Sequence, residues 1–278
     1  MNLAPEHPAA STSERYTGHL CEHPLLLYRA GTERPVCVVV LLHGGEFVSG
    51  SPRGVEAIAE RLSARLAGAV IVPAYTLAGE APFPAAAEDA YAALQWAVRH
   101  AAESGWGTPA LVVVGHEAGG NLAAAAAMMA RDRGEPPIVA QVLVRPMLDP
   151  SQSSRSMRAS CSADAMRLRA AYRAYLPSGS DPMHPYAAPL ASVRLAGLPP
   201  ALLLTAEADP LRDEAEAYAA NLARAGVPTQ VVRMREPADA TSLDVPTLDA
   251  IAAFIGPRVA RPRKSRATPT TIPPARTP

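Results

Sequence analysis

The segment Gly115-His116-Glu117-Ala118-Gly119-Gly120-Asn121 follows the apolar run 110–114 and opens an alanine-rich stretch, 118–131. A short run of Val and Leu predicts a buried strand, and a run of alanines predicts a helix. Small side chains at the junction permit a tight turn from strand to helix. We therefore expect Glu117 at the tip of a sharp strand-to-helix turn.

The same alternation of apolar runs and helical patterns continues on both sides of this turn. Strand–helix–strand alternation predicts a parallel sheet that is covered on both faces, hence an α/β fold. Two earlier runs, 16–20 and 25–28, predict an antiparallel edge. The predicted strands of the main sheet are 36–42, 69–72, 110–114, 138–144, 201–204 and 229–234, and the predicted helices are 54–66, 84–102, 118–131, 163–176, 212–225 and 245–255.

The two ends of the chain differ from the middle in composition. Residues 1–13 are rich in Pro, Ala, Ser and Thr and read as a flexible arm, and residues 257–278 read as a disordered Pro/Arg-rich tail. One domain, 14–256, is expected between them. The N-terminus lacks the apolar core of a signal peptide, and no apolar run is long enough to span a bilayer. These features predict a cytoplasmic protein with no membrane partner.

Composition excludes several other classes of protein. Lys+Arg and Asp+Glu each number 26, so the net charge is zero and no electrostatic footprint for nucleic acid is present. The three cysteines, Cys21, Cys37 and Cys161, are an odd number without metal-ligand spacing. We expect no disulfide framework, no metal and no cofactor.

Two further motifs lie where functional loops of an α/β enzyme belong. His43-Gly44-Gly45-Glu46-Phe47 follows the first central strand, and Asp209-Pro210-Leu211 follows the run 201–204. With the turn at 115–119, they resemble the hormone-sensitive-lipase-like, acetyl-esterase branch of the α/β-hydrolases, over residues 36–254. The resemblance implies an eight-stranded, mostly parallel sheet with helices on both faces, a small cap, and a site at the carboxyl ends of the strands.

The chain departs from this family at residues that carry its chemistry. The family uses a serine, a histidine that takes its proton, and an acid that orients the histidine. Asp209 stands at the position of the acid, but Glu117 replaces the serine and no histidine follows His184. Asp239 falls near the place of the missing histidine, and Glu46 replaces the third glycine of the oxyanion loop.

These departures define the candidate site residues and their alternatives. His43 is expected to brace its loop, His116 to act in the site or to pack in its loop, and Asp209 to act in the site or to pair with Arg212. Glu117 and Glu46, if close together, would share a proton and form an acid–base pair. The catalytic candidates are Glu117, Glu46, Asp209, Asp239 and His116, and the candidates for oxyanion or substrate binding are Gly44, Gly45, Ala118, Phe47 and His184.

Three functions follow from the altered motifs. The first is a non-hydrolytic tailoring enzyme (epimerase or isomerase, cyclase or dehydratase) in bacterial natural-product biosynthesis. The superfamily contains atypical members of this kind, among them the bottromycin peptide epimerase. The second is a ligand-binding pseudo-hydrolase, and the third is an atypical hydrolase with Glu117 as nucleophile. The expected partner is a small-molecule or peptide substrate, and a homodimer is compatible with the sequence.

Overall fold

The computed structural model describes residues 13–20, 23–31, 33–160, 163–179, 181–235 and 244–260. Eight strands in these ranges form one sheet in the order β1-β2-β4-β3-β5-β6-β7-β8. β2 runs antiparallel to both of its neighbours, and the strands from β4 to β8 are parallel. The predicted mostly parallel sheet with an antiparallel edge is confirmed. The strands are β1 (Ser13–Leu20), β2 (His23–Ala30), β3 (Cys37–Leu42), β4 (Ala69–Pro73), β5 (Ala110–His116), β6 (Ile138–Val144), β7 (Ala201–Ala206) and β8 (Thr229–Met234).

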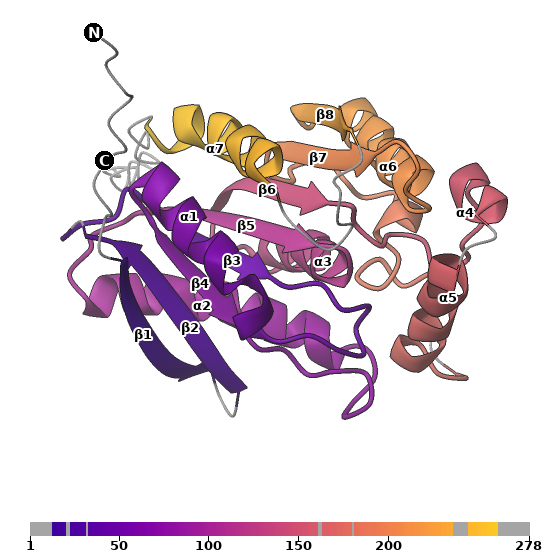
Figure 1. Cartoon of the computed structure of the whole chain (residues 1–278), viewed down its shortest axis with the longest axis horizontal. Coiled ribbons are helices and arrows are strands. Elements are labelled where there is room, and N and C mark those ends of the chain that lie inside the picture. The colour runs from indigo at the N-terminus through magenta and orange to yellow at the C-terminus, as the bar shows by residue number, and fades with distance from the viewer. Residues whose placement is uncertain are drawn as a thin grey trace, which may run out of the picture.

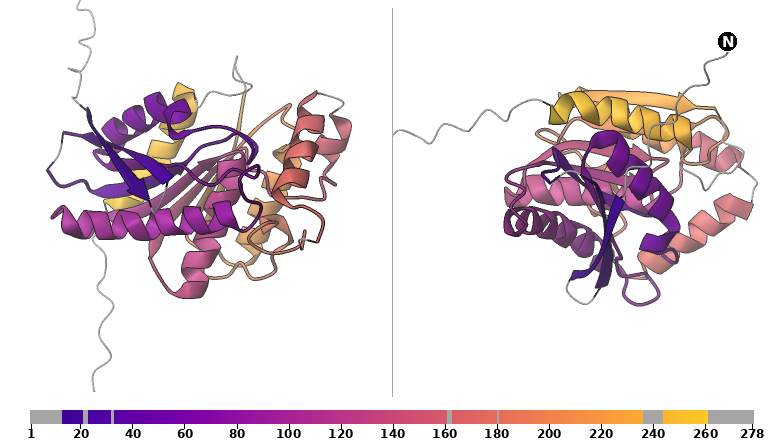
Figure 2. Two further views of the ribbon diagram at one scale, coloured as in Figure 1. Left: turned by 90° about the horizontal axis from the view of Figure 1, so that it is seen from below. Right: turned by 60° about the vertical axis from the view of Figure 1, so that its left-hand side comes forward.

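Helices cover both faces of this sheet, as predicted. α1 and α7 lie on one face, and α2, α3 and α6 lie on the other (Figure 1 and Figure 2). No helix in the described part of the chain is long and apolar enough to cross a membrane. The helices are η1 (Pro52–Val55), α1 (Glu56–Leu66), α2 (Ala85–Glu103), α3 (Ala118–Arg133), α4 (Arg155–Ala159), α5 (Ala163–Tyr175), η2 (Pro189–Ala191), α6 (Arg212–Arg224) and α7 (Val245–Val259).

One predicted helix is longer in the structure, and another helix was not predicted. α7 continues to Val259, so its last turn lies inside the segment that we expected to be tail. α4 was not predicted, because five residues are too few to show helical periodicity. Its N-terminus is capped by Ser154, whose side chain accepts a hydrogen bond from Met157 N.

The central strands are apolar at every position because both of their faces are buried. In β3, Val38, Val40 and Leu42 belong to the core under α2 and α3. The alternate residues Val39 and Leu41 belong to the second core, under α1 and α7. Side chains alternate between the faces of a strand, so one apolar run supplies two cores.

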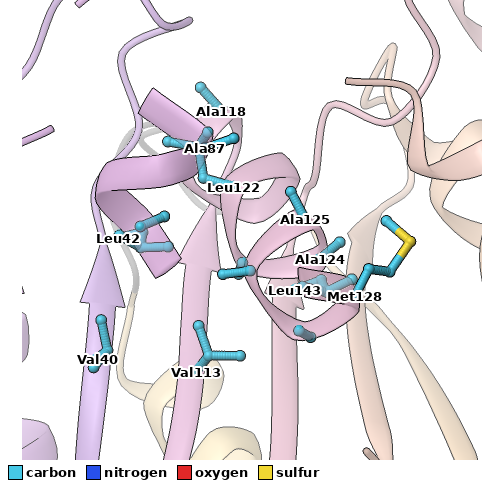
Figure 3. Close-up of a cluster of buried hydrophobic side chains, with 14 of the residues drawn as sticks. Val40, Leu42, Ala87, Val113, Ala118, Leu122, Ala124, Ala125, Met128 and Leu143 are labelled. Atoms are coloured by element: carbon cyan, nitrogen blue, oxygen red, sulfur yellow. The ribbon is translucent and has the colours of Figure 1, made fainter. Parts of the chain in front are cut away.

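Helix α3 is buried on nearly all sides, and its alanines allow this. Thirteen of its residues are buried, including every alanine. Leu122 and Ala125 share a cluster with Leu42, Val113 and Leu143 of the sheet (Figure 3). Small side chains let the helix axis approach the sheet closely. The residue that precedes α3 is thereby held at the end of β5.

The segment after β6 forms the small cap. α4 and α5 lie beyond the carboxyl ends of the parallel strands (Figure 1). Asn121 of α3 is fully buried, and its Nδ2 donates to Met147 O at 2.8 Å and Ala187 O at 3.0 Å. These bonds tie the start of α3 to loops on either side of the cap.

Replacing Gly119 by alanine tests the close contact at the start of α3. A Cβ atom there would lie 2.2 Å from Leu42 O, which is backbone and cannot rotate away. We expect Gly119→Ala to lower the free energy of unfolding by about 2–3 kcal/mol, measured by urea denaturation. Gly54→Ala is the control, because its Cβ meets nothing within 4 Å, and it should change stability by less than about 0.5 kcal/mol. Equal effects of the two substitutions would contradict this account.

Candidate active site

Glu117 occupies a strained turn between β5 and α3, as the sequence predicts. Its φ is 56° and its ψ is −113°, a conformation that side-chain-bearing residues rarely adopt. Backbone hydrogen bonds fix it there: Glu117 N donates to Val144 O at 2.9 Å, and Glu117 O accepts from Met147 N at 3.1 Å. A Cβ atom on Gly115 would lie 2.0 Å from Gly119 O, so the turn also requires glycine at residue 115.

The carboxylate of Glu117 lies against the loop that follows β3. Glu117 Oε2 accepts a hydrogen bond from Gly45 N at 2.9 Å. A Cβ atom on Gly44 would lie 2.9 Å from the same oxygen and 2.8 Å from His116 Nδ1, so these groups meet at one point. A backbone N–H aimed at an oxygen anion is the essential element of an oxyanion hole. Here the protein's own carboxylate accepts that bond.

The loop itself has an unusual backbone. Gly45, Glu46 and Phe47 have φ values of 119°, 57° and 65°, all in the left-handed region. Val48 N and Ser49 N both donate to Gly45 O, which closes the turn. These contacts direct Gly45 N toward Glu117.

His43 stabilises this loop through its side-chain contacts, as expected. Its Nδ1 donates to Gly44 O at 2.7 Å, and its ring stacks on Tyr75 with centroids 4.2 Å apart. Tyr75 also donates its hydroxyl to His43 O at 3.0 Å. Burial lowers the pKa of His43, so the imidazole is neutral at pH 7. These contacts assign His43 a structural role.

Glu46 does not share a hydrogen bond donor with Glu117. It is buried, and its Oε1 accepts from Arg167 Nε of α5. Glu117 instead accepts from Gly45 N. Each carboxylate thus accepts from a donor of its own, both line the same cavity, and the sharing of a proton between them stays a prediction.

Asp209 pairs with an arginine that the sequence reasoning did not single out. Its Oδ2 accepts from Arg145 Nε, and its Oδ1 accepts from Leu211 N at 2.9 Å. Arg212, the partner we had considered, pairs with Asp213. Arg145 directly follows β6 and has a φ of 47°. Its place at the carboxyl end of a predicted parallel strand was a signal that could have identified it.

His116 lies beside this ion pair. Burial lowers its pKa to about 4, and the positive charge of Arg145 acts in the same direction. The imidazole is therefore neutral at pH 7 and is not present as the imidazolium that would serve as a general acid. His116, Arg145 and Asp209 all line the same cavity.

These groups surround a cavity of about 520 Å³. The volume falls within the range of sites for small-molecule ligands. No group of three or more His, Cys, Asp or Glu side chains suited to a metal ion occurs among the residues that the structure describes. The lining residues are His43, Gly44, Gly45, Glu46, Ser49, Gly50, Ser51, Gly54, Val55, His116, Glu117, Arg145, Arg167, Leu168, Asp209, Pro210 and Leu211.

Three of the predicted site residues are not among those that line the cavity, and a fourth cannot be compared. Phe47 is fully buried and stacks on Tyr175 of α5, with centroids 3.9 Å apart. His184 packs against Phe83 with centroids 5.0 Å apart, and neither it nor Phe47 is among the residues that line the cavity. Ala118 was expected to act through its backbone N–H, which stays a prediction, and its side chain belongs to the core. Asp239 lies outside the described residues.

Comparison with known proteins identifies the family of this chain. A sequence profile described as alpha/beta hydrolase fold matches residues 39–238. The chain belongs to this family. It is 35% identical to carboxylesterase NlhH of Mycobacterium tuberculosis over 81% of this chain and 73% of the relative. It is 39% identical to esterase LipI of the same organism over 70% of this chain and 62% of LipI. An esterase of Pyrobaculum calidifontis superposes with a TM-score of 0.79 at 35% identity, covering 88% of this chain and 84% of that structure.

These relatives contradict one prediction. They are named as esterases and carboxylesterases, which points to hydrolysis and not to a non-hydrolytic tailoring enzyme. The prediction of a non-hydrolytic enzyme was wrong because it was argued from the chemistry of one side chain, that of Glu117. The fold is a feature that the chain has in common with a family of hydrolases, and the matched residues 39–238 include the loop after β3 and the turn at Glu117.

A reagent for activated serines tests the assignment of residue 117. We expect a fluorophosphonate to leave the protein unmodified, because Glu117, and not a serine, occupies the turn, and because His43 Nδ1 donates to Gly44 O. Intact-mass spectrometry measures the modification, and an active serine esterase serves as the positive control. Incorporation of one phosphonate per chain at a cavity serine, such as Ser49 or Ser51, would contradict the assignment.

Proposed function

We propose that this protein hydrolyses carboxylic esters by a route in which Glu117 activates water. The observation that carries the proposal is the Glu117 carboxylate at the turn, 2.9 Å from Gly45 N and lining the cavity. The names of the relatives support ester hydrolysis as the reaction. The proposal includes a catalytic triad altered at two of its three positions, the serine and the histidine.

Glu117 acts as a base because a nucleophilic route lacks a second step. A nucleophilic carboxylate would form an anhydride with the acyl group, and another base would then be needed to hydrolyse it. His43 is engaged with Gly44 O and the Tyr75 ring, and His116 lies beside the Arg145–Asp209 ion pair, so the proposal assigns the base to Glu117. General base catalysis needs only one carboxylate and a water molecule within hydrogen-bond reach.

The proposed reaction proceeds in two stages. The ester carbonyl oxygen takes the place of Glu117 Oε2 at Gly45 N, and the freed carboxylate accepts a proton from a water molecule. The water oxygen bonds to the carbonyl carbon, and the carbonyl electron pair moves to the oxygen at Gly45 N. When this intermediate collapses, the C–O bond breaks with its electron pair, and Glu117 returns the proton to the departing alcohol oxygen.

Asp209 and Arg145 support the charges in this scheme. Asp209 is buried, and its ion pair fixes the guanidinium of Arg145 in the cavity wall. A fixed positive charge favours the oxygen anion that develops during attack. Asp209 thus orients an arginine where the family's acid orients a histidine.

Replacing Glu117 by glutamine tests the base. Glutamine keeps the shape of the side chain and cannot accept a proton, so we expect the hydrolysis rate of phenyl acetate or 4-nitrophenyl butyrate to fall by about 10²–10⁴. Glu80→Gln, at an exposed carboxylate outside the cavity, should leave the rate unchanged. An unchanged rate in Glu117→Gln would exclude Glu117 as the base. Saturable binding of esters without turnover by the unmodified protein would contradict the proposed function.

Restoring the serine alone should not create a serine esterase. In Glu117→Ser the hydroxyl has no base to remove its proton, because Asp209 is paired with Arg145. We expect residual catalysis of only about 10³–10⁴ over water, as in enzymes that keep an oxyanion hole without a triad. The rate is measured with 4-nitrophenyl butyrate. Burst kinetics with accumulation of an acyl-enzyme in this variant would reveal a base outside this scheme.

A further inference from the structure

We propose that Arg167 of the cap is a positioning residue that holds the loop after β3 in the shape required at Gly45. The inference rests on the proposed function for its activity readout, whereas its structural readout is independent of activity. Arg167 is distinct from the proposed base Glu117 and from the Arg145–Asp209 ion pair, because it acts through Glu46.

The loop contains a conformation that Glu46 does not adopt readily. Its φ of 57° is left-handed, and a side chain at such a φ is strained unless neighbouring contacts hold it. The next residue, Phe47, shares this property. Gly45 alone in the run has the freedom of glycine. The shape of the loop therefore requires contacts from outside it.

Helix α5 supplies such contacts to both strained residues. Arg167 Nε donates to Glu46 Oε1, and the Tyr175 ring stacks on Phe47 at an interplanar angle of 2°. Ala78 N adds a hydrogen bond to Phe47 O at 2.8 Å. The cap and the loop are therefore linked at two consecutive residues.

The ion pair has one buried and one exposed member. The Glu46 side chain is 8% exposed, and the Arg167 side chain is 62% exposed. A buried carboxylate without its cation would be strongly disfavoured, so Glu46 would turn toward water if Arg167 were removed. That rotation would change the backbone at Glu46 and the direction of Gly45 N. The exposure of Arg167 means that dissolved salt weakens the pair.

The experiment compares Arg167→Met with Arg169→Met, which removes an exposed arginine from the same helix outside the cavity lining. Hydrogen exchange of the backbone amides of residues 44–50 is the structural readout. We expect Arg167→Met to speed this exchange about tenfold, and Arg169→Met to leave it unchanged. Arg167→Lys keeps the charge and should restore part of the protection. Equal exchange in Arg167→Met and the unmodified protein would overturn the proposal.

A double-mutant cycle shows whether Arg167 acts through Glu46. Glycine tolerates a φ of 57° and needs no partner, so in Glu46→Gly the further change Arg167→Met should have no effect on exchange. An additional effect in that background would overturn the proposal. Tyr175→Phe keeps the stacking ring and removes a hydroxyl that has no hydrogen-bond partner among the residues that the structure describes, so it tests whether any change in α5 disturbs the loop. It should leave exchange unchanged.

Ester hydrolysis provides the second readout. We expect Arg167→Met to lower kcat about tenfold with little change in KM, because Gly45 N acts on the charge that forms during reaction. Added NaCl should lower kcat of the unmodified protein toward that of Arg167→Met, whose own kcat should be insensitive to salt. Equal salt sensitivity of the two proteins would overturn the proposal. If no ester is hydrolysed, the proposed function fails, and the exchange measurements still decide the role of Arg167.

Discussion

The close approach of α3 to the ends of β3 and β5 is the constraint on which the site depends. No Cβ atom fits at Gly115 or Gly119, because each would lie 2.0–2.2 Å from a carbonyl oxygen. Because the backbones lie so close together, Glu117, between Gly115 and Gly119 in the chain, lines the cavity with a strained backbone. Whatever side chain residue 117 carries is therefore presented to the loop after β3. The turn is thus a scaffold whose geometry does not depend on the identity of that residue.

A carboxylate on this scaffold meets a backbone amide that is suited to an anion. Glu117 Oε2 accepts from Gly45 N, so a charge that would be unfavourable in an apolar site has a strong donor. A substrate oxygen must replace that carboxylate before it can use the same donor. The contact therefore explains how Glu117 is accommodated. In the proposed reaction it also means that substrate binding must release the Glu117 carboxylate from Gly45 N.

The sequence was sufficient to predict most of the fold and only part of the site. Apolar runs such as that of β3 are buried on both faces, so composition alone identifies them. Glu117, Glu46 and Asp209 were found because motifs place them at strand ends. Phe47 and His184 were misplaced because spacing does not show which way a side chain points. Arg167 gave no signal, since its partner is 121 residues away in the sequence. The wrong functional prediction arose because one substituted side chain was given more weight than the common scaffold.

Two carboxylates of the cavity are each paired with an arginine from another element of the fold. Glu46 is compensated by Arg167 from α5, and Asp209 by Arg145 from the end of β6. Removal of one member of a buried pair leaves an uncompensated charge, which destabilises the fold far more than the loss of an exposed pair. The cavity wall therefore contains two ion pairs in addition to the Glu117 carboxylate. It follows that the site should be tested as a set of coupled residues, because a single reversion leaves the partners of the other charges in place.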